Sequence, residues 1–140
     1  MTSANKFNNY IHNLSLKNIN QATEVWKVML TNTSPVATNT TYSDISATEL
    51  ANGNGYVTGG AVVPGTNSTN SLGVETVAGS AITWTSNTGN MGPFRYAVLV
   101  ASTSGFLCEW WDYGSSITLN GANGDQFVWT PTGSALSIWQ

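Results

Sequence analysis

Apolar residues near the N-terminus follow a helical period. Phe7, Tyr10, Ile11 and Leu14 are spaced three, one and three residues apart, so they fall on one face of a helix. The spacing predicts a short amphipathic helix within residues 5–16.

Beyond this segment, apolar positions alternate with polar ones or form short runs between turn residues. From Ala61 onward the runs recur about every 8–12 residues, which is typical of a β-sandwich or β-barrel. The pattern predicts an N-terminal helix or arm over residues 1–22 and an antiparallel all-β domain over residues 23–140, together forming one folded unit. The expected strands are Glu24–Thr31, Ala61–Val63, Leu72–Val77, Ala81–Ser86, Phe94–Ser102, Phe106–Tyr113, Ser116–Leu119, Gln126–Thr130 and Ala135–Trp139.

One pair of these strands should form the centre of the fold. The run Phe94–Ala101 is apolar on both faces apart from Arg95, as expected for a strand that is covered on both sides. Only Thr103–Gly105 separates its strand from Phe106–Tyr113, which is short enough for a hairpin. We therefore expect these two strands to be antiparallel neighbours.

The loops carry recognisable turn signals. Asp44–Leu50 is predicted to form one helical turn capped by Asp44, and Asn52–Gly55 to form a turn. Asn120–Asp125 has oxygen-bearing side chains but too few acids for a calcium loop. A hairpin turn explains it better.

The composition indicates a neutral, hydrogen-bonding surface. Charged residues make up only 8% of the chain, whereas Asn, Ser, Thr and Gly supply 64 of 140 residues. A protein packed against neighbours needs less surface charge than a free monomer does, so we expect a component of an assembly. The net charge of −3 with four cations excludes a phosphate-binding surface, and hence nucleic acid or an anionic membrane as partners.

The sequence also bears on the compartment. No apolar stretch approaches the roughly 20 residues of a membrane-spanning helix, and the N-terminus lacks the pattern of a signal peptide. The single cysteine, Cys108, excludes an intrachain disulfide. We expect the chain to be made in the cytoplasm.

No combination of residues predicts catalysis. His12 has no acid or nucleophile near it in sequence, and Cys108 lies in an apolar strand pattern typical of a buried residue. Glu109 and Asp112 are three apart on a strand and should point to opposite faces, which is poor geometry for a carboxylate pair. One Cys and one His cannot form a zinc site. We expect no enzyme activity, metal or cofactor.

Tryptophans are the remaining candidates for a binding site. Trp84, Trp110 and Trp129 each alternate in register with another apolar residue and are predicted to lie in the core. Trp111 and Trp139 are predicted to be surface aromatics, which suit a protein interface or a sugar platform.

The strand Phe106–Tyr113 then predicts an interface face. Trp110 should share the core face with Phe106 and Cys108. The opposite face should expose a mixture of side chains typical of interfaces, and together with Trp139 these are the candidate contacts: Leu107, Glu109, Trp111 and Tyr113.

Four segments of the chain carry a family resemblance: Lys27–Thr40, Asn52–Tyr56, Gly92–Leu99 and Trp110–Leu119. They resemble one family of small tailed-bacteriophage virion proteins. The size, low charge and β content are similar to capsid cement, or decoration, proteins, which sit on the outside of the phage head and clamp neighbouring major capsid subunits. The resemblance implies a jelly-roll-like β-sandwich, homo-oligomers at symmetry axes of the shell and no enzyme activity.

Two functions follow as hypotheses. The first is a capsid cement protein on the outer surface of the virion, whose partners are the major capsid protein and further copies of itself as a homodimer or trimer. The second is a receptor- or glycan-binding module of a tail fibre or spike, with Trp111, Trp139 and the Asn/Gly loops as a sugar platform. The chain has no repeat or heptad pattern of a fibre, which favours the first.

Overall fold

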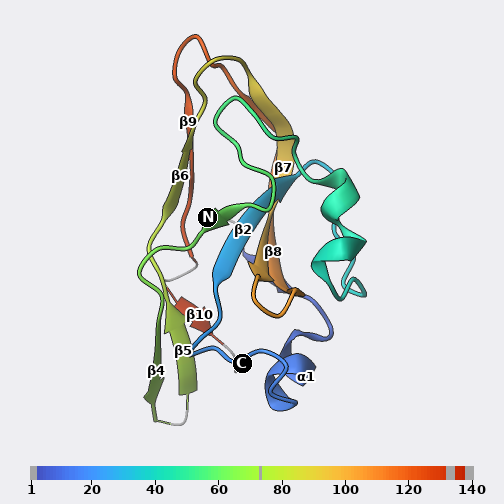
Figure 1. Cartoon of the computed structure of the whole chain (residues 1–140), viewed down its shortest axis with the longest axis vertical. Helices are drawn as coiled ribbons and strands as arrows, with labels where there is room; N and C mark the ends of the chain where they lie inside the picture. The colour runs from blue at the N-terminus through green and yellow to red at the C-terminus, as the bar shows by residue number, and fades with distance from the viewer. Residues whose placement is uncertain (1–2, 73, 132–134, 138–140) are drawn as a thin grey trace.

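The chain folds mainly into antiparallel β-sheets, which confirms the all-β class (Figure 1). The structure is a computed structural model and describes residues 3–72, 74–131 and 135–137. Its elements, in chain order, are β1 (Ala4–Lys6), α1 (Tyr10–Ser15), β2 (Trp26–Thr31), the 3-10 turns η1 (Tyr42–Asp44) and η2 (Ser46–Thr48), β3 (Ala61–Val62), β4 (Asn67–Ser71), β5 (Val74–Ala78), β6 (Ile82–Thr85), β7 (Met91–Ala101), β8 (Phe106–Leu119), β9 (Gln126–Trp129) and β10 (Ala135–Ser137).

The largest sheet has five strands in the order β1-β8-β7-β2-β3. The predicted central hairpin is confirmed: β7 pairs with β8 on one side and β2 on the other, antiparallel in both cases. Every residue of β7 from Tyr96 to Ala101 is buried, as expected for a strand covered on both faces.

A second group of strands lies across one face of this sheet. It contains a three-stranded sheet, β10-β5-β4, and a two-stranded sheet, β6-β9. β6 follows β5 after three residues, and in Figure 1 β6 and β9 lie beyond β5 and β10, so the two small sheets continue one another along the molecule. The sheets are not closed on one another, and the finer prediction of a jelly-roll-like sandwich stays a prediction.

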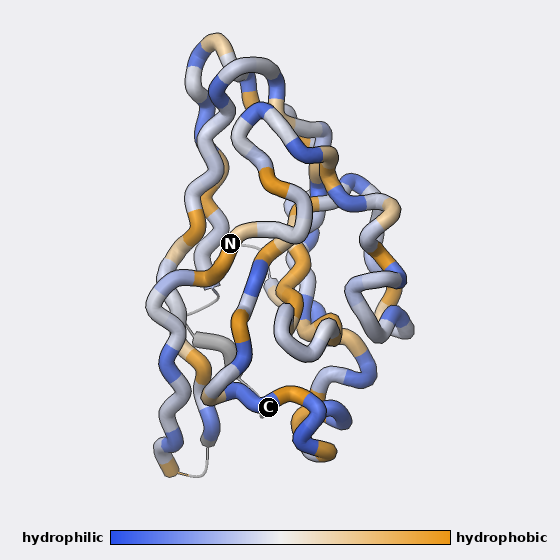
Figure 2. Tube along the Cα trace, in the orientation of Figure 1, coloured by the Kyte–Doolittle hydropathy of each residue, from blue (hydrophilic) through white to orange (hydrophobic). Residues whose placement is uncertain are grey.

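Side chains on the two faces of the five-stranded sheet form two apolar clusters. The larger cluster joins Trp26, Leu99 and Trp111 of that sheet to Trp84 and Trp129 of the opposite strands, so the predicted core positions of Trp84 and Trp129 are confirmed. The smaller cluster lies on the other face and consists of Phe7, Met29, Ile45, Val98, Val100 and Leu107. Figure 2 shows hydrophobic stretches along the strands and mostly hydrophilic or neutral residues in the loops.

The N-terminal segment differs from its prediction. Only Tyr10–Ser15 is helical, because Ala4–Lys6 pairs with β8 as an edge strand and Phe7 enters the smaller cluster. Tyr10 is buried in the larger cluster. The segment is therefore part of the same folded body as the sheets.

Other differences concern strand ends and turns. Asn67–Ser71 forms a strand that its polar sequence did not predict, and the expected strands Phe106–Tyr113 and Ser116–Leu119 are one continuous strand, β8. Asp44 ends η1, and its carboxylate accepts hydrogen bonds from the N–H groups of Thr40 and Thr41. The Asn120–Asp125 turn is present, but it joins β8 to β9 of a different sheet and so is not a hairpin.

Candidate interaction surface

The positions of the candidate contacts that follow Cys108 depend on an irregularity in β8. Leu99 pairs with Glu109 and Val100 pairs with Leu107, so Cys108 is an extra residue opposite this pair of β7 residues. Such a β-bulge shifts the alternation of side chains by one position. Residues after Cys108 therefore point to the face opposite to the one that the sequence predicts.

The predicted exposed face is buried. Leu107, Trp111 and Glu109 are 1%, 2% and 5% exposed, so their assignment to a free surface is wrong. Trp111 lies in the larger cluster and packs edge-on against Trp129, with ring centroids 5.1 Å apart. Leu107, which precedes the bulge, faces the smaller cluster beneath η1 and η2.

The other aromatic residues of the predicted interface and core faces are only partly exposed or lie outside the described residues. Trp110 is half-buried on the smaller cluster, where its ring lies 4.6 Å from that of Phe7, so its predicted place in the main core is also wrong. Tyr113 is half-buried and packs edge-on against Phe127 at 5.0 Å. Trp139 lies outside the described residues.

Glu109 is a buried carboxyl group on the larger-cluster face. Burial raises the pKa of Glu109 to about 7, although Lys6, its partner across the β1–β8 ladder, acts to lower that pKa. Burial likewise raises the pKa of the Cys108 thiol, which is fully buried as predicted. Both groups are therefore buried side chains of the core rather than groups exposed to a ligand.

The other six acidic side chains are bound to the chain's own groups. Glu24 accepts hydrogen bonds from the N–H groups of Thr103, at 2.5 Å, and Ser104, at 3.2 Å, and thereby closes the β7–β8 turn. The Asp112 carboxylate forms a two-pronged ion pair with Arg95, at 2.7 and 2.9 Å. Ser68 donates to Glu75, Asn120 N–H donates to Asp125, and Asp44 and Glu49 are also acceptors.

Glu49 binds together three segments of the loop region. It accepts hydrogen bonds from the hydroxyl of Tyr42, from the hydroxyl of Tyr56 at 2.5 Å and from Gly59 N–H at 2.7 Å. The Tyr56 hydroxyl in turn accepts from Leu30 N–H of β2 at 3.1 Å. This carboxylate therefore fixes the loop to the sheet instead of facing solvent as a free charge.

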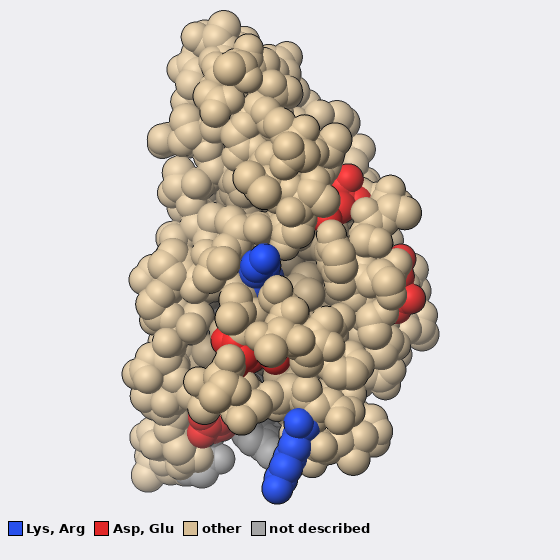
Figure 3. Space-filling view, viewed as in Figure 1, with Lys and Arg blue, Asp and Glu red and all other residues tan. Residues whose placement is uncertain are grey.

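The face of the molecule drawn in Figure 3 accordingly shows few charged groups. Within the described residues Arg95–Asp112 is the one ion pair, which leaves three lysines as unpaired cations. A large part of the accessible surface is therefore neutral Asn, Ser, Thr and backbone.

One end of the five-stranded sheet exposes apolar side chains on the face of the smaller cluster. Val62 of β3 pairs with Lys27 of β2, and Val25 lies two residues before Lys27 on the same face. Val25 and Val62 are 43% and 53% exposed. We call Val25, Lys27 and Val62 the β2–β3 patch. Lys27 also borders a shallow hollow of about 220 Å³ beside Tyr42 and Gly105.

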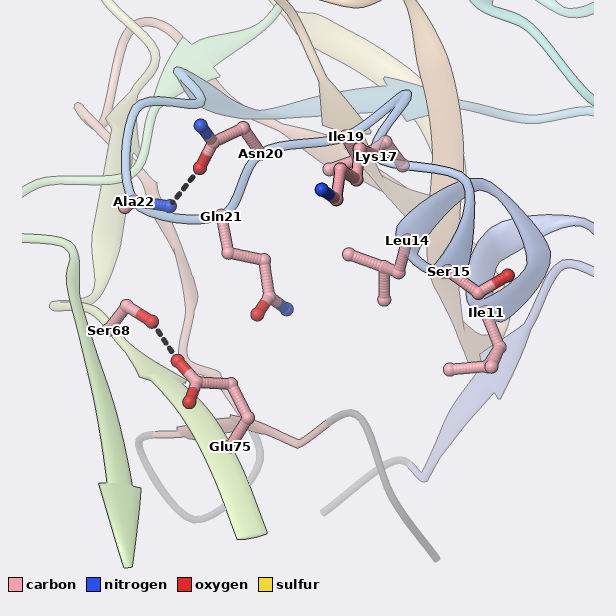
Figure 4. A pocket seen from close by; sticks show the side chains of 10 residues that line it. All are labelled: Ile11, Leu14, Ser15, Lys17, Ile19, Asn20, Gln21, Ala22, Ser68 and Glu75. Carbon is pink, nitrogen blue, oxygen red and sulfur yellow. Dashed lines mark hydrogen bonds between the residues drawn. The ribbon is translucent and has the colours of Figure 1, made fainter. Parts of the chain in front are cut away.

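A larger hollow of about 510 Å³ lies between the α1 region and the β4–β5 strands (Figure 4). Leu14 and Ile19 give it apolar walls, and the Gln21 side chain extends into the space between them and Glu75. The Glu75 carboxylate is held by Ser68 on the far side. Lys17 and Glu75 both line the hollow, but within the described residues no ion pair joins them.

The described residues contain no group of three or more His, Cys, Asp or Glu side chains that could hold a metal ion. His12 is exposed on α1. No helix in the described part of the chain has the length and apolar character needed to span a bilayer.

Comparison with known proteins gives no match. No family model, no curated protein and no solved structure is similar to this chain by these comparisons.

Proposed function

We propose that the chain is a structural protein of a phage virion, a capsid cement protein that binds the outside of the shell and clamps neighbouring major capsid subunits. It acts by contact alone and needs no cofactor. The proposal includes a jelly-roll-like arrangement of the strands, which is supported by the single core shared between the five-stranded sheet and the β6–β9 pair.

The observation that carries this proposal is the internal use of the acidic side chains. Six of the seven acids accept hydrogen bonds from the chain itself, and the seventh, Glu109, is buried. A charged surface must be desolvated when it is covered, whereas a neutral one loses less hydration free energy. The centre of an interface is accordingly depleted in charge. This surface is suited to being covered.

The β2–β3 patch is the best candidate for the contact with the shell. Val25 and Val62 give the patch exposed apolar area, and Lys27 gives it one positive charge that could pair with a partner. Val62 lies in β3, a short two-residue edge strand. The other residues that line the adjoining hollow are neutral, so Lys27 could form an ion pair with an acidic side chain of the shell.

The glycan-binding alternative loses one of its two proposed stacking aromatics, because Trp111 is 2% exposed. Sugar stacking requires an open aromatic face. No other observation on the described residues favours that alternative.

Co-sedimentation with undecorated phage heads tests the proposal. We expect the wild-type chain to bind near stoichiometrically with capsid subunits, and Val62→Glu to bind at least tenfold more weakly because a carboxylate would be buried in the contact. Val128→Glu is the matched control, since Val128 is 50% exposed on β9, away from the patch. It should bind within twofold of wild type.

Two outcomes would contradict the proposal. Absence of wild-type binding to heads would remove the cement function itself. Equal binding by Val62→Glu and wild type would show that the β2–β3 patch is not the contact. A stained gel of purified particles gives an independent measure, because a cement protein must approach the copy number of the capsid subunit.

A further inference from the structure

Strand β4 is a free sheet edge without the usual protection. It lies at the end of the order β10-β5-β4 and pairs only with β5 (Figure 1). Its five residues, Asn67–Ser71, contain no charged side chain and no proline, and its pairing with β5 has no register shift. Natural edge strands normally carry a lysine, a proline or a bulge that prevents pairing with another chain.

Four other sheet ends in the described residues, at β1, β3, β6 and β9, are better protected, and β10, at the opposite edge of the same sheet as β4, has only three residues. β1 carries Lys6, and β3 is two residues long with Pro64 soon after it. At β6, Gly55 lies so close to the Thr85 carbonyl that an added Cβ would be 2.1 Å from its oxygen. β9 is followed by Pro131. The contrast singles out β4 as an edge that can accept a further strand.

The register of the hairpin shows which backbone groups β4 presents. Ser71 pairs with Val74, so two residues form the connection, and Leu72 has the positive φ of 51° that such a turn requires. In a two-residue hairpin the flanking pair is hydrogen-bonded, and the bonded pairs alternate from there. Thr69 therefore bonds to Thr76 in β5, and the N–H and C=O groups of Ser68 and Asn70 point outward.

We infer that β4 is a self-association edge, and that two copies of this chain pair antiparallel through it about a two-fold axis at Thr69. In this register Ser68 of each copy faces Asn70 of the other. Both residues have outward backbone groups, so the two pairs together form four hydrogen bonds. Thr69 meets its own equivalent at the axis, as a non-hydrogen-bonded pair of β-branched residues.

The partner is a second copy because the edge complements itself. The arrangement places neutral polar side chains opposite one another at every position and no like charges, so nothing on β4 repels its equivalent. A symmetric contact of this kind is isologous, which closes at two copies. The edge is smaller than a standard interface of about 1,600 Å², so pairing is weak in dilute solution and strengthens where many copies are held close together.

Disulfide trapping on the isolated chain tests the pairing directly. Thr69→Cys places two thiols at a Cα separation of about 4.5 Å, within the range for a disulfide. Thr76→Cys is the matched control: its residue is the partner of Thr69 in β5, but the two copies lie three strand spacings apart, about 14 Å. Cys108 is buried, so we expect it not to react under these conditions.

Under mild oxidation we expect covalent dimer to form at least tenfold faster with Thr69→Cys than with Thr76→Cys. A mixture of Ser68→Cys and Asn70→Cys chains, tagged to differ in mass, should give mainly the mixed dimer, since the axis brings residue 68 opposite residue 70. Equal rates for the first two variants would overturn the pairing, as would no crosslinking of Thr69→Cys. A mixture that yields mainly homodimers would overturn the register. None of these results depends on binding to a capsid.

Discussion

Replacing Trp111 with alanine should destabilise the fold far more than replacing Trp110. Trp111 is 2% exposed and packs on Trp129 between the two layers of strands, whereas Trp110 is half-buried on the smaller cluster. A buried tryptophan removes about 150–250 Å² from water, which corresponds to roughly 4–6 kcal/mol at 25 cal/mol per Å². Measured Trp→Ala costs are about 3–5 kcal/mol.

Domains of this size have a free energy of unfolding of roughly 5–15 kcal/mol, so Trp111→Ala takes up a large part of it. Trp110→Ala should cost about 1–2 kcal/mol, because the tryptophan side chain is only half-buried and the change removes its contact with Phe7. Urea unfolding followed by circular dichroism gives both values, and Trp111→Phe should lie between wild type and Trp111→Ala. A larger cost for Trp110→Ala than for Trp111→Ala would refute the bulge at Cys108.

Two further predictions concern buried polar groups. Since the pKa of Glu109 rises from an ordinary value near 4.5 to about 7 on folding, the protonated form stabilises the fold fully below pH 4.5 and this stability is lost as the pH rises through 7. Glu109→Gln should therefore leave stability at pH 4 nearly unchanged, raise it by about 3 kcal/mol at pH 9 and flatten the pH profile of the urea midpoint; an unchanged slope would contradict this. Tyr56→Phe should cost about 1–3 kcal/mol, because Leu30 N–H loses its buried acceptor and Glu49 loses a donor. Tyr42→Phe, at a more exposed hydroxyl that donates to the same carboxylate, is the control and should cost less in the same titration.

The elements that the sequence predicted best are those with one clear hydrophobic period. β2 and β7 were expected within a few residues of their bounds, because burial on one or both faces requires the apolar pattern that they carry. The pairing of β7 with β8 followed from the short connection between them. Asn67–Ser71 was missed because it buries no apolar face, and it forms a strand through its ladder with β5.

The candidate site was missed for a more specific reason. From Phe106 to Trp111 apolar side chains occur on both parities of the strand, so the sequence has no period that could reveal an extra residue. The bulge at Cys108 is determined by pairing with β7, which is a long-range contact. The alternation of Val25 and Lys27 with Trp26 and Val28 did contain the signal for the β2–β3 patch, since it placed them opposite the main core.

The small number of charged residues has two structural consequences: most acids are bound to backbone N–H groups, and β4 carries no charge that would block pairing with another chain. Long loops leave many backbone N–H groups outside regular ladders, and a nearby carboxylate can accept hydrogen bonds from them. Five of the seven carboxylates accept from such N–H groups, in Glu24, Asp44, Glu49, Asp112 and Asp125. Acids used in this way cannot also protect sheet edges, and the four cations lie elsewhere than on β4. The neutral surface that favours contact with other proteins therefore comes together with an edge that is open to a second copy.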